Sequence, residues 1–434
     1  MVSVLAVLDL RGVPLSELAL RLPRPEPMGE LPLQAVRSII AQVKQGGDEA
    51  LFELGERFDG IRPRFLRVPE AEMQAALERI PAPLRTALEA AALEITNYHR
   101  HGIVSLPPYE ADGVQVEELR RPVKRAGCYV PGGRARYPSS VLMTAIPAIV
   151  AGVEEVAVCT PPGPGGTVDD ATLAAAAIAG VSDLYAIGGA QAIAAMAYGT
   201  ETVRAVDVIA GPGNVYVSLA QREVAGTVGV PPSFAGPSEV VVIADETTDI
   251  RHAALDVVVQ AEHGPAGLAW LVTWSIEVAD KVAAEVAKIV EESPRAAEIR
   301  STLDAGGYAV VVDGPEEALA VSDAVAPEHL ELMCDRPGDL LDLVHNAGVV
   351  FCGPWAPASV GDYAAGPSHV LPTYGSARFA SVLGVDDFTK KVHAVTLSRQ
   401  GLERLAPHVE QIAIAEGLDT HARSVAERVK GGDR

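Results

Sequence analysis

Glu328 and His329 stand side by side in the chain and supply two groups that exchange protons near neutral pH. An imidazole and a carboxylate are the side chains most often used for acid–base catalysis. Pro327 disfavours helix in the residue before it, and the alternation of residues 329–332 predicts the start of a short strand. This segment alone fits either a catalytic pair at a strand edge or a loop that carries charge into a strand.

A second polar group ends the helix that we predict from Ile250. Gln260 and His263 are three residues apart, which places both on one face at the carboxyl end of this helix. Zinc usually binds His, Cys and carboxylate, so a glutamine ligand would be unusual. The alternative is a histidine C-cap that is stopped by Gly264 and Pro265.

Two further segments carry polar residues near glycines. A long loop after the predicted strand 349–352 contains Asp362 and His369, and loops of this length tend to be functional. Near the end of the chain, Glu416 and His421 flank a glycine, where either could simply begin a solvated helix. An amide, two imidazoles and a carboxylate are compatible with a divalent metal ion, and the residues in question are Gln260, His263, Asp362 and His421.

The elements that must position these residues indicate an α/β fold. Residues 33–101 have helical periodicity, and a Pro-rich break at 106–108 precedes an alternation of short strands with helices. Such an alternation favours parallel sheets with right-handed crossovers, here in two halves that meet near Ser238. Predicted strands are 126–130, 155–160, 183–187, 206–210, 239–244, 268–274 and 309–313. Predicted helices are 171–179, 190–198, 215–224, 250–262, 276–292 and 316–325.

Two glycine-rich turns fall at the carboxyl ends of predicted strands, where open α/β sheets bind ligands. One is 188–191, which includes Gln191, and the other is 211–214, which includes Asn214. Neither has the spacing G-x-G-x-x-G, so the dinucleotide signal by itself is weak. The Pro-Ser turn before Glu239 could place Ser238 at a binding site, although most such serines only close a turn.

Composition narrows the classes of function. The chain has 57 acidic and 35 basic residues and a formal charge of −22, which makes a nucleic-acid or anionic-membrane surface improbable. Its longest apolar run, 141–153, is too short to span a bilayer, so we expect a soluble, cytoplasmic protein. The four cysteines form no C-x-x-C pair, so neither disulfides nor a thiolate metal site is expected.

Taken together and in order, these motifs resemble those of zinc-dependent histidinol dehydrogenases of histidine biosynthesis, from about residue 30 to 426. The matching segments are 129–133, 189–192, 210–214, 235–239, 260–264, 326–330, 361–363, 369–373 and 416–421.

The resemblance implies a role for each residue. Glu328 and His329 would be catalytic, and Tyr129, Gln191 and Asn214 would contact NAD. One Zn²⁺ per subunit would be bound by Gln260, His263, Asp362 and His421. The substrate-binding residues would be Ser238, Gln260, His263, His329, Asp362, His369, Glu416 and His421.

The resemblance also implies an aldehyde/histidinol dehydrogenase-like fold with two incomplete Rossmann-like domains. The larger would comprise 25–136 and 237–383, with the smaller inserted at 137–236. An N-terminal arm at 1–24 and a C-terminal dimerisation extension at 384–434 would complete a homodimer. Glu416 and His421 would then complete the site of the partner subunit.

The implied reaction is the four-electron oxidation of L-histidinol to L-histidine, through L-histidinal, by two NAD⁺. His329 would be the general base, Glu328 would activate water for hydration of the aldehyde, and zinc would position the substrate. The alternatives are a related dehydrogenase acting on another alcohol, a zinc hydrolase that uses no nucleotide, and a metal-binding module without catalysis.

Overall fold

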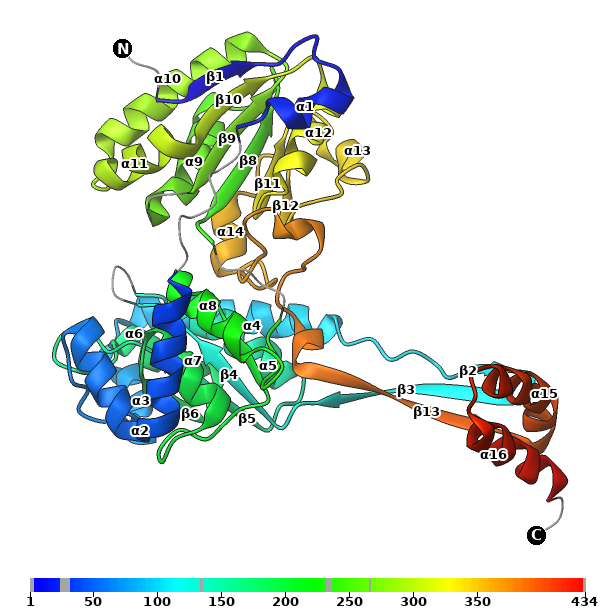
Figure 1. Cartoon of the computed structure of the whole chain (residues 1–434). Helices are drawn as coiled ribbons and strands as arrows, with labels where there is room; N and C mark the ends of the chain where they lie inside the picture. Colours follow the sequence, from blue (N-terminus) through cyan, green and yellow to red (C-terminus); the bar gives the residue numbers. More distant parts are fainter. Residues whose placement is uncertain (1–3, 24–31, 133–135, 232–235, 265–266, 432–434) are drawn as a thin grey trace. The chain divides into compact units, whose positions relative to one another are not determined.

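The structure is a computed structural model that describes residues 4–23, 32–132, 136–231, 236–264 and 267–431. It divides into two compact units, each of which is described by itself. The first unit comprises Met1–His101 and Val123–Phe388, and the second comprises Gly102–Pro122 and Thr389–Arg434. The first unit contains two parallel sheets with helices on both faces, and the second contains an antiparallel sheet with two helices (Figure 1).

Six parallel strands form the larger sheet, in the order β1-β10-β9-β8-β11-β12. The chain runs from β8 outward to β9 and β10, and then crosses to β11 and β12 on the other side of β8. The order therefore reverses between β8 and β11, which makes this position a topological switch point. The strands are β1 Ala6–Asp9, β8 Glu239–Ala244, β9 Leu268–Thr273, β10 Gly307–Val311, β11 His329–Met333 and β12 Val349–Cys352.

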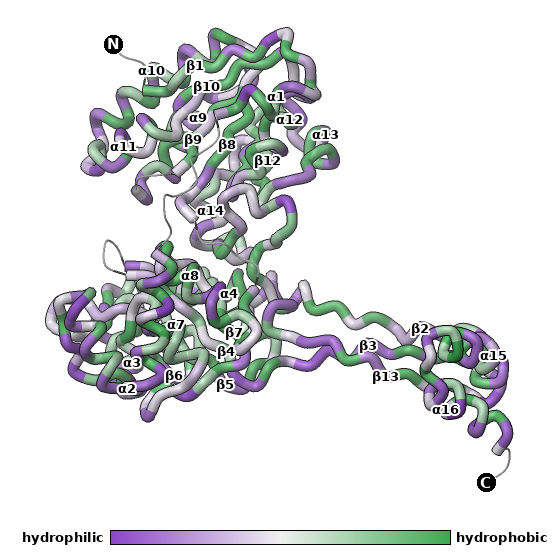
Figure 2. The backbone as a smooth tube through the Cα atoms, viewed as in Figure 1, coloured by the Kyte–Doolittle hydropathy of each residue, from purple (hydrophilic) through white to green (hydrophobic). Residues whose placement is uncertain are grey.

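Both faces of this sheet are covered by helices, which explains the continuous apolar sequence of β8. Val240 and Val242 pack in one core with α9, α10 and α11, whereas Val241 and Ile243 pack in another with α1 and α12. Figure 2 shows the hydrophobic colour of these strands and the mixed colour of the helices around them. The helices are α1 Leu15–Arg21, α9 Ile250–Val259, α10 Ile276–Glu292, α11 Ala296–Gly306 and α12 Pro315–Val325.

On β11 the same alternation sets the direction of the polar side chains. Leu330 and Leu332 belong to the core with α12. Since successive side chains of a strand point to opposite faces, His329 and Glu331 point to the face that α9 covers. The strand predicted after Pro327 is thereby confirmed.

Four parallel strands form the smaller sheet, in the order β6-β5-β4-β7. Its order reverses between β4 and β7, which gives the unit a second switch point. The strands are β4 Arg125–Tyr129, β5 Glu155–Thr160, β6 Asp183–Ala186 and β7 Val208–Ala210.

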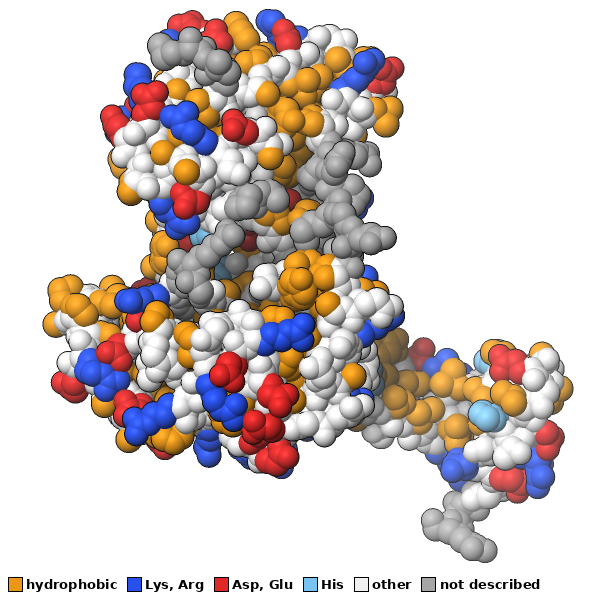
Figure 3. Space-filling model, turned by 60° about the vertical axis from the view of Figure 1, so that its left-hand side comes forward, with side chains coloured by type: hydrophobic (Ala, Val, Ile, Leu, Met, Phe, Trp, Pro, Cys, Tyr) orange, Lys and Arg blue, Asp and Glu red, His pale blue; other side chains and the backbone are white. Residues whose placement is uncertain are grey.

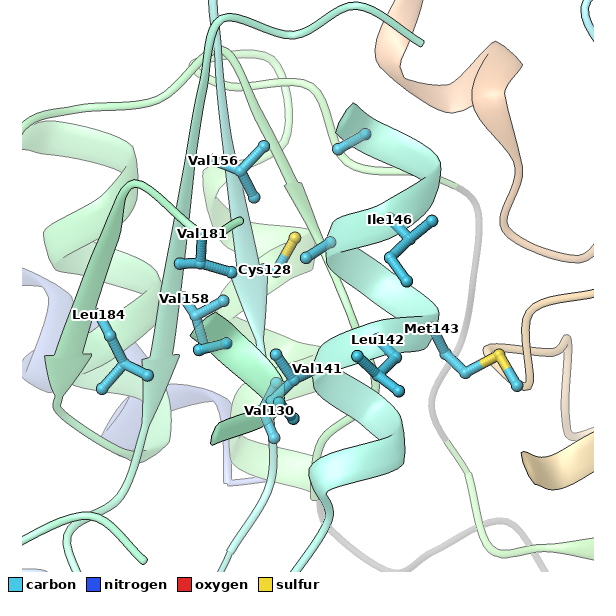
Figure 4. Packing of buried hydrophobic residues seen from close by; sticks show 14 of the residues in the cluster. Cys128, Val130, Val141, Leu142, Met143, Ile146, Val156, Val158, Val181 and Leu184 are labelled. Carbon is cyan, nitrogen blue, oxygen red and sulfur yellow. The ribbon is translucent and has the colours of Figure 1, made fainter. Parts of the chain in front are cut away.

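Helices also cover both faces of the smaller sheet. One core joins its strands to α3, α4, α5 and α6, and the other joins them to α2, α7 and α8. Figure 4 shows Cys128 and Val158 of the strands facing Val141 and Leu142 of α5, so the longest apolar run of the sequence begins as a buried helix. The helices are α2 Leu33–Asp59, α3 Glu70–Arg79, α4 Ala82–His101, α5 Pro138–Val150, α6 Asp170–Ala179, α7 Gly189–Tyr198 and α8 Val215–Val224.

The second unit is built differently from the two parallel sheets of the first unit. Its three strands are antiparallel in the order β13-β3-β2, and α15 and α16 pack on one another beside them. Asp112 and Gly113 form the turn between β2 and β3, with φ of 48° and 77°, and Asp-Gly is a common sequence for such hairpins. The elements are β2 Tyr109–Ala111, β3 Val114–Pro122, β13 Thr389–Leu397, α15 Arg399–Ala415 and α16 Asp419–Lys430.

The α/β class and the alternation of strands and helices between 155 and 325 are confirmed, with boundaries that differ by up to three residues. The helix α11 was not predicted. Residues 1–24 were expected to form an arm or a short helix; residues 6–9 form β1 of the larger sheet, and residues 15–21 form the short helix α1, which packs on it. Pro25 and Pro27 lie outside the described residues, and the domain boundaries stay a prediction. The remaining short elements are η1 Gln260–His263, α13 Pro337–Leu341, α14 Ala358–Tyr363, η2 Ser376–Arg378 and η3 Val385–Phe388.

No helix among the described residues is both long enough and apolar enough to cross a membrane.

Candidate active site

The turn that carries Glu328 and His329 lies at the amino end of β11. The helix α12 ends at Val325, and Ala326 follows with φ 51° and ψ 61°. This left-handed conformation costs about 1–2 kcal/mol for a residue with a Cβ, so the surrounding structure must hold it. The Glu328 carbonyl accepts a hydrogen bond from the Val349 N–H at 3.0 Å, which ties the turn to β12.

Both side chains are held by the first residue of the neighbouring strand β8. The Glu239 N–H donates to Glu328 Oε2 at 3.1 Å, and the Glu239 carbonyl oxygen lies 3.0 Å from His329 Nδ1. Because a carbonyl oxygen can only accept, Nδ1 of His329 carries a proton. The other ring nitrogen, Nε2, lies 3.3 Å from Asp362 Oδ1. The nitrogen that can exchange a proton is therefore Nε2.

Asp362 joins the helix α14 to three other predicted site residues. Its Oδ2 accepts a hydrogen bond from Gln260 Nε2 at 3.0 Å, and its carbonyl oxygen lies 2.8 Å from His369 Nδ1. His369 Nε2 lies 3.0 Å from the Ser140 hydroxyl on α5. Since Nδ1 of His369 must donate to the carbonyl, Nε2 accepts from Ser140. The structure thus brings together Gln260, His329, Asp362 and His369.

His263 ends the 3-10 turn η1 that begins with Gln260. The Thr302 hydroxyl lies 2.6 Å from the Gly264 carbonyl oxygen and 3.2 Å from that of Ala261, which holds the shape of this turn. Burial lowers the pKa of His263, although the charge of Asp362 opposes this effect. His263 is therefore neutral at pH 7, which is the form that binds metal ions.

The charged groups around His329 shift one another's pKa values. Burial raises the pKa of Glu328 to about 7, although the charge of His329 and the Glu239 N–H oppose the shift. Burial, together with the charge of Glu328, raises the pKa of Glu239 to about 8. Burial alone would lower the pKa of His329, but the charge of Glu328 and the bond to Asp362 raise it to about 9. The site is therefore poised to move protons near neutral pH.

The three residues expected to contact NAD lie at the carboxyl edge of the smaller sheet, around its switch point. Tyr129 ends β4, and its hydroxyl accepts a hydrogen bond from the Gly189 N–H at 3.0 Å. Gln191 lies in the first turn of α7, and its Oε1 would be 2.7 Å from a Cβ at Gly189. Asn214 follows β7 and caps α8, where its Oδ1 accepts from two backbone N–H groups. Helix amino ends at a switch point favour bound phosphate groups.

The remaining predicted residues are placed differently. Ser238 is half-buried and directly precedes Glu239, and its carbonyl accepts from the Leu268 N–H at 3.1 Å. Glu416 and His421 lie in the second unit, exposed at the turn between α15 and α16. Of the sequence motifs, Gly133, Ala235 and Pro265 lie outside the described residues.

The donor atoms fit a metal ion in part. Within the part of the chain that the structure describes, no group of three or more His, Cys, Asp or Glu residues is placed as metal ligands. Gln260 and Asp362 nevertheless touch, and the charges of His263 and Asp362 interact. An amide oxygen, an imidazole and a carboxylate are suitable for a borderline divalent ion that takes a further ligand from elsewhere.

Two residues of the site were missed by sequence analysis. Glu239 holds both catalytic candidates through its backbone, and its buried side chain accepts from the Tyr374 N–H at 3.2 Å. It directly follows Ser238 in the Gly-Pro-Ser-Glu motif, so a signal was present. Ser140 has no such signal, because it belongs to an apolar helix with no polar neighbour pattern.

Comparison with known proteins shows similarity along nearly the whole chain. The family model described as histidinol dehydrogenase matches residues 24–429. A histidinol dehydrogenase of Synechococcus sp. is 46% identical over 92% of this chain and 93% of its own length. One from Bacillus cereus is 45% identical over 91% of this chain and 92% of its own. The crystal structure of histidinol dehydrogenase from Elizabethkingia anophelis is 34% identical, with a TM-score of 0.95 over 99% of both chains.

Proposed function

The chain belongs to the histidinol dehydrogenase family, and from this membership we propose a role for each residue of the site. It is an oxidoreductase of histidine biosynthesis that acts on histidinol. We propose the oxidation of L-histidinol to L-histidine through L-histidinal, in which two NAD⁺ accept two hydrides. The observation that carries this proposal is the buried pair of Glu328 and His329, held by Glu239 and Asp362.

In the first oxidation, His329 acts as the base. Its Nε2 takes the hydroxyl proton of histidinol while a hydride leaves the carbinol carbon for the nicotinamide, which yields histidinal and NADH. Nδ1 stays bonded to the Glu239 carbonyl, so the ring keeps its orientation. The charges of Glu328 and Asp362 raise the pKa of His329 to about 9, so the ring must release its Nε2 proton to solvent before it acts as the base, and the same charges stabilise the imidazolium that forms again in the reaction.

In the second oxidation, Glu328 activates a water molecule. Its carboxylate takes a proton from the water as the water oxygen bonds to the aldehyde carbon, and the imidazolium returns its proton to the former carbonyl oxygen. The hydrate then loses a hydride to the second NAD⁺ and a proton to His329, which yields the acid. A carboxyl group with a pKa of about 7 is well matched to this task.

Gln260, His263 and Asp362 would hold a Zn²⁺ ion together with His421, and a bound ion would supply an anchor for the nitrogen atoms of the substrate. The hydrogen bond between Gln260 and Asp362 supports a shared role for these two side chains. His369 orients Asp362 by donating a hydrogen bond from Nδ1 to the backbone carbonyl of Asp362. Ser238 and Glu416 are proposed to bind the substrate.

NAD is proposed to bind at the carboxyl edge of the smaller sheet through Tyr129, Gln191 and Asn214. The positive φ of 66° at Gly189 and of 118° at Gly211 supports this location. A Cβ at Gly211 would overlap the Tyr129 carbonyl, so the turn needs glycine there. A turn without side chains lets a cofactor approach the backbone closely.

A homodimer is proposed in which Glu416 and His421 complete the site of the partner subunit. The second unit supports this proposal because it exposes large hydrophobic side chains, visible in orange in Figure 3. Exposed apolar patches of this kind mark interaction surfaces. The residues are Ile103, Val104, Leu106, Tyr109, Val392, Val395, Leu397, Val409, Ile412, Ile414 and Leu418. The cytoplasmic location expected from the sequence stays a prediction.

The reaction is tested by adding NAD⁺ and histidinol to the purified protein and following the near-ultraviolet absorbance of NADH. Two NADH are expected per histidinol consumed. Removal of metal with a chelator should abolish turnover, and added zinc should restore it.

The same assay separates the alternatives. A zinc hydrolase or a metal-binding module forms no NADH, and a dehydrogenase for another alcohol forms none from histidinol. Full activity in a preparation shown to be free of metal would rule out the zinc role.

A further inference from the structure

A second pair of carboxyl groups lies next to the site and has no part in the proposed reaction. Glu331 is two residues beyond His329 on the same face of β11, and only 1% of it is exposed. Asp256 on α9 is 8% exposed and interacts with Glu331 through its carboxyl group. Buried acids are rare in proteins unless they are paired, so this pair needs a physical account.

The contacts of Glu331 show how two carboxyl groups can be buried next to each other. Its Oε1 accepts a hydrogen bond from the Ala358 N–H at 3.1 Å. Its Oε2 is buried and receives no hydrogen bond from an N–H or O–H group of the described chain. Two carboxyl groups bond to one another only when one of them holds a proton. Burial raises the pKa of both carboxyl groups, that of Glu331 to about 9, so the pair shares a proton near neutral pH.

The same pair connects the three elements that carry the site. Asp256 lies on α9 one helical turn before Gln260, and Ala358 begins α14 one turn before Asp362. Glu331 itself lies on β11 with His329. The residue before α14, Pro357, provides no side-chain cap for this helix. Glu331 therefore takes the place of the missing cap.

We propose that Asp256 and Glu331 are positioning residues, which hold α9 and α14 at the spacing that lets Gln260 and Asp362 bind one ion beside His329. The inference rests on the proposed zinc site. It adds to the proposed metal ligands the residues that orient them. Substitution of such orienting residues typically lowers metal affinity about 10–100-fold.

The test measures the rate at which zinc leaves the protein to a chromogenic chelator. Glu331→Leu removes both hydrogen bonds, and we expect zinc release about 10-fold or more faster than in the unmodified protein. Glu331→Gln can still accept from Ala358 and donate to Asp256, so its release rate should stay close to that of the unmodified protein. The KM for histidinol should rise in Glu331→Leu by more than kcat falls.

Leu332→Ala is the matched control, because it loosens the same strand from its opposite face without touching the carboxyl pair. At a similar loss of thermal stability, it should release zinc at the normal rate. Should Glu331→Leu fail to fold, Ala358→Pro breaks the same hydrogen bond by removing its donor, the Ala358 N–H. Proline is tolerated in the first turn of a helix, and Pro357 already has the extended φ of −71° and ψ of 154° that a following proline requires.

The outcomes separate this inference from the proposed function. If the unmodified protein binds no zinc, both the metal site and the inference are wrong. If it binds zinc, and Glu331→Leu or Ala358→Pro releases the metal no faster than Leu332→Ala, the positioning role alone is rejected. Rapid release from Glu331→Gln would also contradict it.

Discussion

Glu328 and His329 are adjacent in sequence and both are held by the backbone of Glu239, but only His329 also contacts Asp362. We expect substitutions of the two residues to affect different steps of the reaction. His329 Nε2 faces Asp362, and Glu328 Oε2 accepts from the Glu239 N–H. In the proposed mechanism His329 is needed in both oxidations, whereas Glu328 is needed only in the second, when water adds to the aldehyde. The choice of substrate therefore separates the two roles. The two groups are therefore best compared by supplying histidinol and histidinal separately.

We predict that His329→Asn lowers the rate of both oxidations by about 100-fold or more, the usual contribution of a general base. Glu328→Gln should lower the oxidation of histidinal by a similar factor and leave the oxidation of histidinol nearly unchanged. Single-turnover formation of NADH from each substrate measures both effects. Equal losses for the two substrates in Glu328→Gln would contradict the division of labour.

At the scale of elements, the strands of the smaller sheet are joined by a buried ionic network at their amino ends. Arg125 on β4 contacts Glu155 on β5 and donates to Asp183 on β6 at 2.7 Å, and only 2% of the Asp183 side chain is exposed. Burial alone would raise the pKa of Asp183, but Arg125 and its neighbours lower it. The network therefore stabilises the sheet only while Asp183 is ionised.

We predict that Arg125→Met costs about 3 kcal/mol of unfolding free energy at pH 7, at the low end of the cost of breaking a buried ion pair, because Asp183 keeps only the more exposed Arg67 and Arg204 as partners. A carboxyl group with a lowered pKa stabilises the fold above its unfolded pKa of about 3.9, and this contribution is lost as the pH falls through the folded pKa. The difference between Arg125→Met and the unmodified protein should therefore shrink in acid. Urea unfolding at several pH values measures it, and a difference that does not change with pH would reject the explanation.

Secondary-structure elements could be predicted from the sequence more accurately than the tertiary contacts between them. The apolar alternation of β11 and the buried run of β8 identify strands without further information, because burial on one or both faces leaves a direct pattern. The helix α5 is apolar on all sides and so has no periodicity to read. In β3, charged residues such as Glu117 and Arg120 obscured the strand, and the Asp112-Gly113 turn was its only clear signal.

The candidate site could be assembled from the sequence only through family resemblance. Gln260 and Asp362 are 102 residues apart, and their contact depends on which strands are neighbours in the larger sheet. Periodicity predicts that a strand exists and leaves its neighbours open. For the same reason Glu239 was not singled out: its role arises from the pairing of β8 with β11, which places it beside Glu328 and His329.

At the scale of the whole molecule, the first unit uses its two sheets in different ways. The NAD candidates lie at the carboxyl edge of the smaller sheet, as expected for an open α/β fold. Glu239 and His329 instead begin their strands, so the proposed catalytic pair lies at the amino edge of the larger sheet. The polar residues of the site lie on the connection that follows β8. The helix α9 and its continuation η1 run back to the amino edge of the sheet and bring Gln260 and His263 there.

The proposed sharing of sites between subunits makes a prediction that no monomeric enzyme could meet. His329→Asn inactivates the first unit of its own chain, and His421→Asn inactivates only the contribution of the second unit. In a mixed dimer, the first unit of the His421→Asn chain would receive an intact second unit from the His329→Asn chain. Each mixed dimer has one intact site of two, so the isolated mixed dimer should have about half of the normal activity, and an unseparated random mixture of equal amounts about a quarter.

Co-expression of the two variants with different affinity tags, followed by isolation of the doubly tagged dimer, provides the sample. Each variant alone is the control and should be inactive or nearly so. A doubly tagged dimer without activity would show that His421 serves the site of its own chain, because sites built within one chain gain nothing from mixing. Recovery of activity would assign the exposed turn between α15 and α16 to the partner's site.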